Sequence, residues 1–180
     1  RLVSRANRSG AGRVTVDGDV VECLELEARL SARYHLDDCT VAPDLHEGDL
    51  PLRALGAAGA RVLAREMARD GTALIGLGHG RTLSAAIAAL PRAPVRHVRF
   101  VALMGGLTRH YAANPHDVMH RLTERTGAEA YVLPVPFFAN TVADREVLLS
   151  QRGVAEVVTL GQQADVMLPG IGTAEPDAQL

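Results

Sequence analysis

The sequence predicts an α/β fold in which a parallel sheet is covered by helices on both faces. Short apolar runs alternate with segments of helical periodicity over the second half of the chain, as strand–helix–strand units do. Glycine-rich loops follow three of these runs, at residues 76–80, 105–106 and 170–172. No run approaches the roughly 18 apolar residues that a membrane helix needs, so we interpret the runs as buried strands.

The composition is that of one compact domain rather than of a nucleic-acid-binding surface. Of the 180 residues, 47% are hydrophobic and 22% are charged, and the net charge is −2. All 19 basic residues are arginines, which excludes lysine Schiff-base chemistry within this chain. The two cysteines form no CxxC pair and the first residues carry no secretion signal, so we expect a cytoplasmic protein with no membrane partner.

Five elements are expected in the first part of the chain. Val20, Cys23 and Ala28 recur at helical spacing, and Gly10 is a usual stop signal for a helix. The predicted elements are the end of a helix at Arg1–Ser9, a strand at Arg13–Val16, a helix at Val20–Tyr34, a strand at Cys39–Val41 and a helix at Leu50–Arg69.

Strands and helices alternate after that point. The helix predicted at Pro115–Thr126 has Asn114 as a favourable N-cap and Pro115 at its first position. In parallel sheets, ligands bind beyond the carboxyl ends of the strands. The predicted strands are Ala73–Leu77, Arg99–Leu103, Ala130–Leu133 and Val166–Leu168, and the predicted helices are Thr82–Leu90, Pro115–Thr126, Val142–Ser150 and Val154–Gln163.

The loop Gly76–Thr82 lies between a predicted strand and a predicted helix. Its glycines would let backbone N–H groups approach an anion, and Arg81 and Thr82 would add a guanidinium and a hydroxyl. A dinucleotide loop would need its third glycine one residue later, and a Walker loop would need a lysine. No cofactor is therefore predicted, and the spacing leaves two interpretations open: an anion site or a tight packing turn.

Two further features are expected to face the same edge of the sheet. The turn at Met104, Gly105 and Gly106 ends the next strand, where adjacent glycines allow either close ligand approach or a plain turn. Asn114, His116 and Asp117 open the following helix. Asn114 could simply cap it, and His116 and Asp117 could contact a sugar hydroxyl or complement the helix dipole.

Metal and hydrolytic chemistry find no support in the residue pattern. Only His116 and His120 share a helix face, and no glutamate stands between them as in an HExxH metal motif. Ser84 lies inside a predicted helix and not in a GxSxG elbow, so a Ser-His-Asp triad is not predicted. We therefore expect neither a metal site nor a catalytic residue.

Taken in order, these loops resemble the effector-binding domain of the SorC/DeoR-type sugar-binding transcriptional regulators. The resemblance implies a Rossmann-like fold of the sugar-isomerase and CoA-transferase type. It covers essentially the whole chain, and the segments that carry it are Leu24–Leu30, Gly76–Leu83, Met104–Gly106, Leu133–Pro136, Asp144–Leu149, Gln163–Val166 and Gly170–Gly172.

The resemblance also implies roles for individual residues. The phosphate of a sugar-phosphate effector would be bound by Gly78, His79, Gly80, Arg81 and Thr82, and the sugar by Met104, Gly105, Gly106, Asn114 and His116. Two of these positions depart from the family pattern: tryptophan is frequent at the position of His79, and His116 replaces the second residue of an Asn/Gln-x-Asn pair.

At the N-terminus, Ser4 and Arg5 resemble the exit of the family's DNA-recognition helix, and the local arginines fit contacts to phosphates. We therefore predict that residues 1–10 are the tail of a helix-turn-helix domain and that residues 11–180 are the effector-binding domain, with the chain truncated at both ends.

The function implied is an effector-sensing domain of a bacterial regulator of carbohydrate metabolism, and not an enzyme. Its expected partners are a phosphorylated sugar, operator DNA through the missing N-terminal domain, and further copies in a homodimer or homotetramer. The alternative is a phosphosugar isomerase, which needs a carboxylate base near the sugar carbons. Asp117 and Glu175 are the only candidates for that base near the ends of strands.

Overall fold

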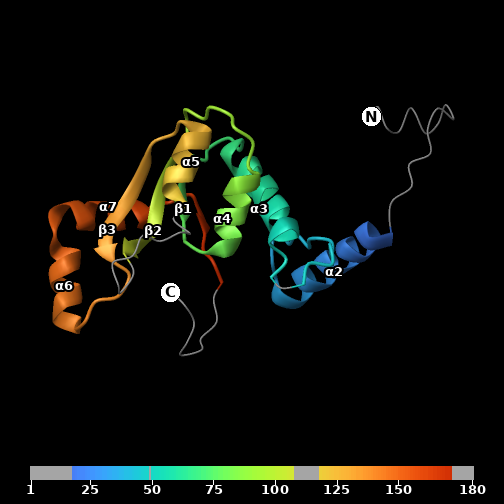
Figure 1. Cartoon of the computed structure of the whole chain (residues 1–180), viewed down its shortest axis with the longest axis horizontal. Coiled ribbons are helices and arrows are strands. Elements are labelled where there is room, and N and C mark those ends of the chain that lie inside the picture. Colours follow the sequence, from blue (N-terminus) through green and yellow to red (C-terminus); the bar gives the residue numbers. More distant parts are fainter. Residues whose placement is uncertain (1–17, 49, 108–117, 172–180) are drawn as a thin grey trace. The chain divides into compact units, whose positions relative to one another are not determined.

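The structure, a computed structural model, describes residues 18–48, 50–107 and 118–171 (Figure 1). The chain divides into two compact units, residues 1–54 and 55–180. The predicted helix end at Arg1–Ser9 and the predicted strand at Arg13–Val16 lie outside the described residues.

The first unit contains helix α2, Gly18–Tyr34, as the periodicity predicts. His35 follows it with a positive φ of 54°, a left-handed conformation that ends helices. The strand predicted at Cys39–Val41 is wrong, because that segment is irregular. The reason is a side chain: the backbone N–H of Val41 donates to Glu27 Oε1 at 2.9 Å instead of to a neighbouring strand.

Helix α3, Leu52–Met67, begins in the first unit and continues into the second. Its first turn is capped by Glu47, whose carboxylate accepts hydrogen bonds from the N–H groups of Arg53 and Ala54 at 2.9 and 3.0 Å. A carboxylate at this place satisfies open donors and complements the helix dipole. The prediction of a helix at Leu50–Arg69 is therefore confirmed, two residues shorter at each end.

The second unit is built on a four-stranded parallel sheet. Its strands are β1 (Leu74–Leu77), β2 (Arg99–Leu107), β3 (Ala130–Pro136) and β4 (Val166–Leu168), in the spatial order β3-β2-β1-β4. Ile75 pairs with Phe100 of β2 on one side and with Val166 of β4 on the other. The predicted α/β fold with a parallel sheet is thus confirmed.

Side chains alternate between the two faces of this sheet. Ile75, Leu77 and Phe100 are completely buried and pack with residues of α3, α4 (Arg81–Ala89) and α5 (Met119–Thr126). Burying a side chain of this size contributes about 1.5–3 kcal/mol. This layer is the main core.

The opposite face carries the other residues of the same strands. Leu103 and Val101 lie against Gly161 of helix α7, Arg152–Gln162, where an added Cβ would be 3.8 and 4.0 Å from them. Helix α6, Val142–Ser150, precedes α7 and is capped by the Thr141 hydroxyl, which accepts from the N–H of Asp144. In Figure 1, α7 lies on the other side of the sheet from α4. Both faces are therefore covered, as predicted.

Two strands are longer than the sequence predicted. β2 does not end at Leu103 but runs through Gly105 and Gly106, so the predicted turn there is wrong. Gly105 pairs with Leu133, and its lack of a side chain lets the backbone of β3 approach at Val135 and Pro136. Strand β3 contains two prolines, which the sheet tolerates because β3 is an edge strand.

Helix α5 is described from Met119 onward, with Val118 at its N-cap. The predicted start at Pro115, with Asn114 as cap, lies outside the described residues. Gly127 ends the helix with a φ of 63°, and its N–H donates to the carbonyl of Thr123. No helix in the described part of the chain is long and apolar enough to span a bilayer.

Candidate functional site

The order of the strands creates a switch point beside β1. Strands β2 and β3 extend the sheet to one side of β1, whereas β4 lies on its other side. In such sheets a crevice opens beyond the carboxyl ends of the strands where the order reverses. Gly78 follows β1 at this place, and its N–H donates to the carbonyl of Leu168 in β4 at 3.0 Å.

The loops after β1 and β4 touch through their backbones. A Cβ on Gly78 would lie 3.1 Å from the nitrogen of Gly170 and 3.3 Å from the Cε of Met104. A Cβ on Gly170 would lie 2.6 Å from the carbonyl oxygen of His79. A side chain at Gly170 would force the two loops apart, whereas at Gly78 it would need a shift of a few tenths of an ångström in its neighbours.

The N-terminus of α4 also lies at this switch point, and we use the word crevice for the loops after β1 and β4 together with this helix start. Gly80 is its N-cap, with a φ of 124° that side chains rarely adopt, and no side chain of the described residues caps the helix there. The first bond of the helix joins the N–H of Ser84 to the carbonyl of Gly80 at 2.9 Å. The N–H groups before Ser84 thus lack acceptors within the helix, and together with the helix dipole they favour an anion.

His79 joins this loop to β2. Its Nε2 lies 3.4 Å from the carbonyl oxygen of Met104, a long contact that fits an N–H on Nε2. Its Nδ1 is buried without a hydrogen-bond partner among the described residues. A buried, unpaired polar atom costs about 1–3 kcal/mol of folding free energy. A ligand group that donated a hydrogen bond to Nδ1 of His79 would remove this cost.

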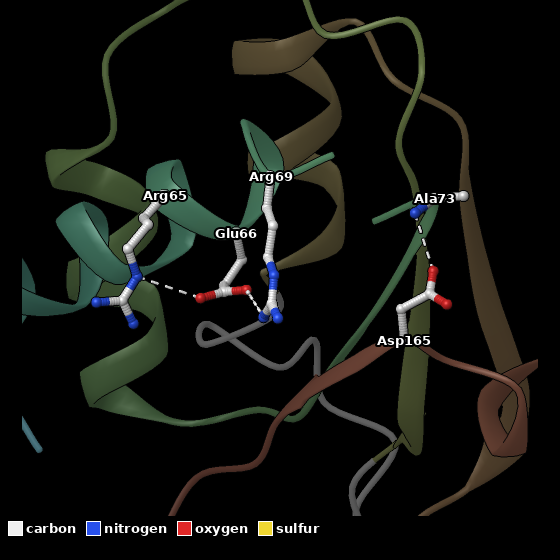
Figure 2. A network of polar contacts seen from close by, with 5 residues as sticks. All are labelled: Arg65, Glu66, Arg69, Ala73 and Asp165. Atoms are coloured by element: carbon white, nitrogen blue, oxygen red, sulfur yellow. Dashed lines mark hydrogen bonds and ion pairs between the residues drawn. The ribbon is translucent and has the colours of Figure 1, made fainter. Parts of the chain in front are cut away.

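The start of β4 is held beside the start of β1 by one carboxylate. Asp165 Oδ2 accepts from the N–H group of Ala73 at 2.9 Å (Figure 2) and from that of Leu74, also at 2.9 Å. These two bonds lower the pKa of Asp165. The N–H of Asp165 in turn donates to the carbonyl of Leu74 at 2.9 Å. These hydrogen bonds fix the register of β4 against β1. They thereby align the loops that follow the carboxyl ends of the two strands.

A second polar group lies at the end of α3, also drawn in Figure 2. Glu66 is buried to about nine-tenths, and its two oxygens accept from Arg65 Nε at 3.2 Å and Arg69 Nη1 at 3.3 Å. A buried carboxylate needs such partners. It stabilises the end of α3 and does not belong to the crevice.

The structure brings together part of the predicted site. Residues 78–82 form one loop and helix start, and Met104 reaches it from β2. Gly105 is buried against β3, which explains its glycine without a ligand, and Gly106 lies in the strand with open space beside it. Asn114, His116, Ser4 and Arg5 lie outside the described residues, as do Asp117 and Glu175.

Three residues of this region escaped the sequence prediction of the site. Gly170 contacts the loop after β1, and the signal for it was its place directly after a strand. Arg121 Nη1 donates to Ser84 Oγ at 3.1 Å, which links α5 to the first turns of α4. No spacing in the sequence reveals this pair, because the two residues are 37 positions apart.

Within the described ranges, no group of three or more His, Cys, Asp or Glu side chains is placed to hold a metal ion. His120 is exposed, and its Nε2 lies 3.5 Å from Glu124 Oε1. The sequence pattern predicts that this histidine shares one helix face with His116. The polar groups at the start of α4 are backbone amides and the Ser84 hydroxyl with the guanidinium of Arg121, which suit an anion rather than a cation.

Comparisons with known proteins identify the family of this chain. A family model described as "Putative sugar-binding domain" matches residues 18–180. The chain is 57% identical, over 180 residues, to the erythritol catabolism regulatory protein EryD of Brucella abortus and covers 57% of it. It is 26% identical over 178 residues to the transcriptional regulator LsrR of Escherichia coli, a match that covers 96% of this chain and 51% of LsrR. The chain thus spans little more than half the length of these relatives.

Solved structures share the fold. The full-length sorbitol operon regulator SorC of Klebsiella pneumoniae superposes with a TM-score of 0.70 at 23% identity, over 93% of this chain and 55% of SorC. A domain described as a "possible sugar-binding transcriptional regulator", from Arthrobacter aurescens, superposes with a TM-score of 0.76 at 24% identity, over 92% of this chain and 64% of that domain.

Proposed function

The chain belongs to the sugar-binding domain family of the SorC/DeoR-type transcriptional regulators, and from this premise we propose that it senses a phosphorylated sugar or polyol at the loop Gly78–Thr82. The observation that carries the proposal is the open N-terminus of α4 at the switch point of the sheet. An anion placed there accepts from backbone N–H groups and meets the positive end of the helix dipole. The Thr82 hydroxyl and the Arg81 guanidinium are the side chains that would add to this cradle.

The carbon skeleton of the effector would lie beyond the phosphate, toward the loops after β2 and β4. We assign its contacts to Met104 and Gly106, with Asn114 and His116 from the start of the following helix. The relative EryD is by its name a regulator of erythritol catabolism, and its 57% identity extends over the whole of this chain. A phosphorylated four-carbon polyol is therefore the first effector to test.

The complete protein would convert effector binding into a change in DNA affinity. We propose that residues 1–10, with Ser4 and Arg5, continue from a helix-turn-helix domain and that residues 11–180 belong to the effector domain. An effector that binds one arrangement of a homodimer or homotetramer better than another shifts the population toward it. A regulator that acts on bacterial operator DNA works in the cytoplasm.

The isomerase alternative has less support. EryD, LsrR and SorC are all named as regulators. The crevice built by the described residues presents backbone amides and arginine rather than a carboxylate base.

The experiment is a calorimetric titration of the full-length protein with D-erythritol 4-phosphate, erythritol and inorganic phosphate, followed by incubation of each with the protein and product analysis. We expect saturable binding of the phosphate ester, weaker binding of the two fragments, and no turnover. Release or recruitment of the operator by the ester, measured by fluorescence anisotropy, would link binding to regulation. An isomerised product, or equal binding of erythritol and its phosphate, would contradict the proposal.

A further inference from the structure

Helix α5 holds helix α4 at both ends with two arginines. Arg121 Nη1 donates to the hydroxyl of Ser84 at 3.1 Å, near the start of α4. Arg125 Nη1 donates to the carbonyl oxygen of Leu90, the C-cap of α4. The two arginines are four residues apart and therefore project from the same face of α5.

The middle of α4 is fixed by different contacts. A Cβ on Gly56 of α3 would lie 3.0 Å from the backbone and side chain of Ala85, and a Cβ on Gly59 would lie 2.9 Å from the Cβ of Ala86. Ile87 is fully buried in the core on the same helix. This packing fixes the middle of the helix, whereas its first turns also depend on the contact between Ser84 and Arg121.

The two arginines differ in their electrostatic relation to α4. Arg125 lies at the C-terminus of α4, where a positive charge is favoured by the helix dipole and where a free carbonyl needs a donor. Arg121 lies near the N-terminal end, where the dipole disfavours a positive charge. Arg125 is therefore placed to stabilise the free protein, and Arg121 is placed where a positive charge is favourable once an anion is bound.

Resting on the function proposed above, we infer that Arg121 is a positioning residue of the effector site. Through Ser84 it holds the first turns of α4, and with them the loop Gly78–Thr82, against the N-terminal turn of α5. The connection is short, because the N–H of Ser84 donates to the carbonyl of Gly80, one turn earlier. A shift of Ser84 displaces the N–H groups that would receive the phosphate, and a displacement of 1 Å is enough to weaken such a site.

The contact needs one donor of sufficient reach, not the full guanidinium fork. Lysine at position 121 would supply the required N–H donor and the same charge, without the planar fork. Glutamine would supply neither the charge nor the length. Ser84→Ala removes the acceptor but leaves the charge of Arg121. These three variants separate the hydrogen bond from the charge, and Arg125→Gln is the matched control on the same helix face.

The test measures the dissociation constant of the full-length protein for D-erythritol 4-phosphate and inorganic phosphate, and the Tm without ligand. For Arg121→Gln we expect about tenfold weaker binding of the ester, because the variant loses both the positive charge near the bound anion and the bond that holds Ser84, with little change in Tm. Arg121→Lys should keep most of the affinity. Ser84→Ala should weaken binding several-fold, and the double variant with Arg121→Gln should lose no more than Arg121→Gln alone. Arg125→Gln should lower the Tm but leave the affinity unchanged.

Unchanged affinity in Arg121→Gln, or an equal loss in Arg125→Gln, would overturn the positioning role and leave the proposed function standing. Failure of the wild-type protein to bind either phosphate would overturn the proposed function instead. Hydrogen exchange without ligand gives a separate measurement: the amide of Ser84, which donates to the carbonyl of Gly80, should exchange faster in Arg121→Gln than in wild type. If it does not, Arg121 does not hold this turn.

Discussion

The carboxylate of Asp165 accepts a hydrogen bond from the backbone N–H of Ala73, which lies 92 residues earlier in the chain. The bond closes a loop that contains most of the second unit and places the start of β4 beside the start of β1. The crevice at the other end of these strands depends on that register, because Gly78 and Gly170 meet only when β1 and β4 are aligned.

Asp165→Asn should lower the Tm at neutral pH, since the ionised carboxylate is the better acceptor for two N–H groups. These bonds lower the pKa of Asp165 below its usual value of 3.8. A lowered pKa in the folded state means that the stabilisation is complete above about pH 4 and is lost as the pH falls through the lower value. The difference in Tm between wild type and variant should therefore shrink in acid. Calorimetry from about pH 2.5 to about pH 7 measures it, because this range extends on both sides of the ordinary pKa of an aspartate carboxyl group. Asp70→Asn, on the exposed turn after α3, is the control and should leave the Tm at neutral pH nearly unchanged.

Gly170→Ala should disturb the crevice directly. The added Cβ would lie 2.6 Å from the carbonyl oxygen of His79, so one of the two loops must move. We expect a loss of about 1–3 kcal/mol in the free energy of unfolding, as for overpacking elsewhere, together with weaker binding of the phosphate ester. Gly153→Ala, in α7 with open space beside it, should instead stabilise the protein by about 0.5–1 kcal/mol. Equal effects of the two substitutions in urea unfolding would contradict the packing argument.

Replacing Arg81 and Thr82 by alanine should weaken binding of the phosphate ester at least about tenfold, since each lost hydrogen bond to a charged group is worth about 1.5–3 kcal/mol. Arg81 is exposed and Thr82 is half-buried, so the Tm without ligand should change little. Calorimetric titration of the full-length protein measures the first effect and a thermal melt the second. Thr159→Ala, which removes an exposed hydroxyl on α7, controls for the loss of a threonine. Undiminished affinity would show that the phosphate binds elsewhere.

Glu66→Gln should destabilise the protein by about 1–3 kcal/mol, because a nearly buried carboxylate with two arginine partners is replaced by a neutral amide. Glu156→Gln breaks the exposed pair with Arg152 at 3.2 Å and should cost less than about 0.5 kcal/mol. Urea unfolding of both variants tests the contrast. Affinity for the phosphate ester should be unchanged in both, since neither glutamate lies at the crevice.

Most of the fold was accessible from the sequence because it depends on local patterns. The apolar run at Leu74–Leu77 and the periodicity of Gly18–Tyr34 each give the right element. The errors have specific causes. The backbone N–H of Val41 bonds to a side chain of α2, so the strand expected there does not form. Gly105 continues strand β2 instead of ending it, because the backbone of β3 packs closely against this glycine. Neither partner is near in sequence.

By itself the sequence determined the alternation of strands and helices, the parallel sheet and the glycine loop after β1, since periodicity and glycine content act over a few residues. The tertiary structure decided which loops meet. Only the strand order places Gly170 against His79, and only the packing of α5 on α4 brings Arg121 to Ser84. Contacts of this kind depend on the register of strands and the crossing of helices, which are fixed by the packing of the whole core and leave no trace in the spacing of residues.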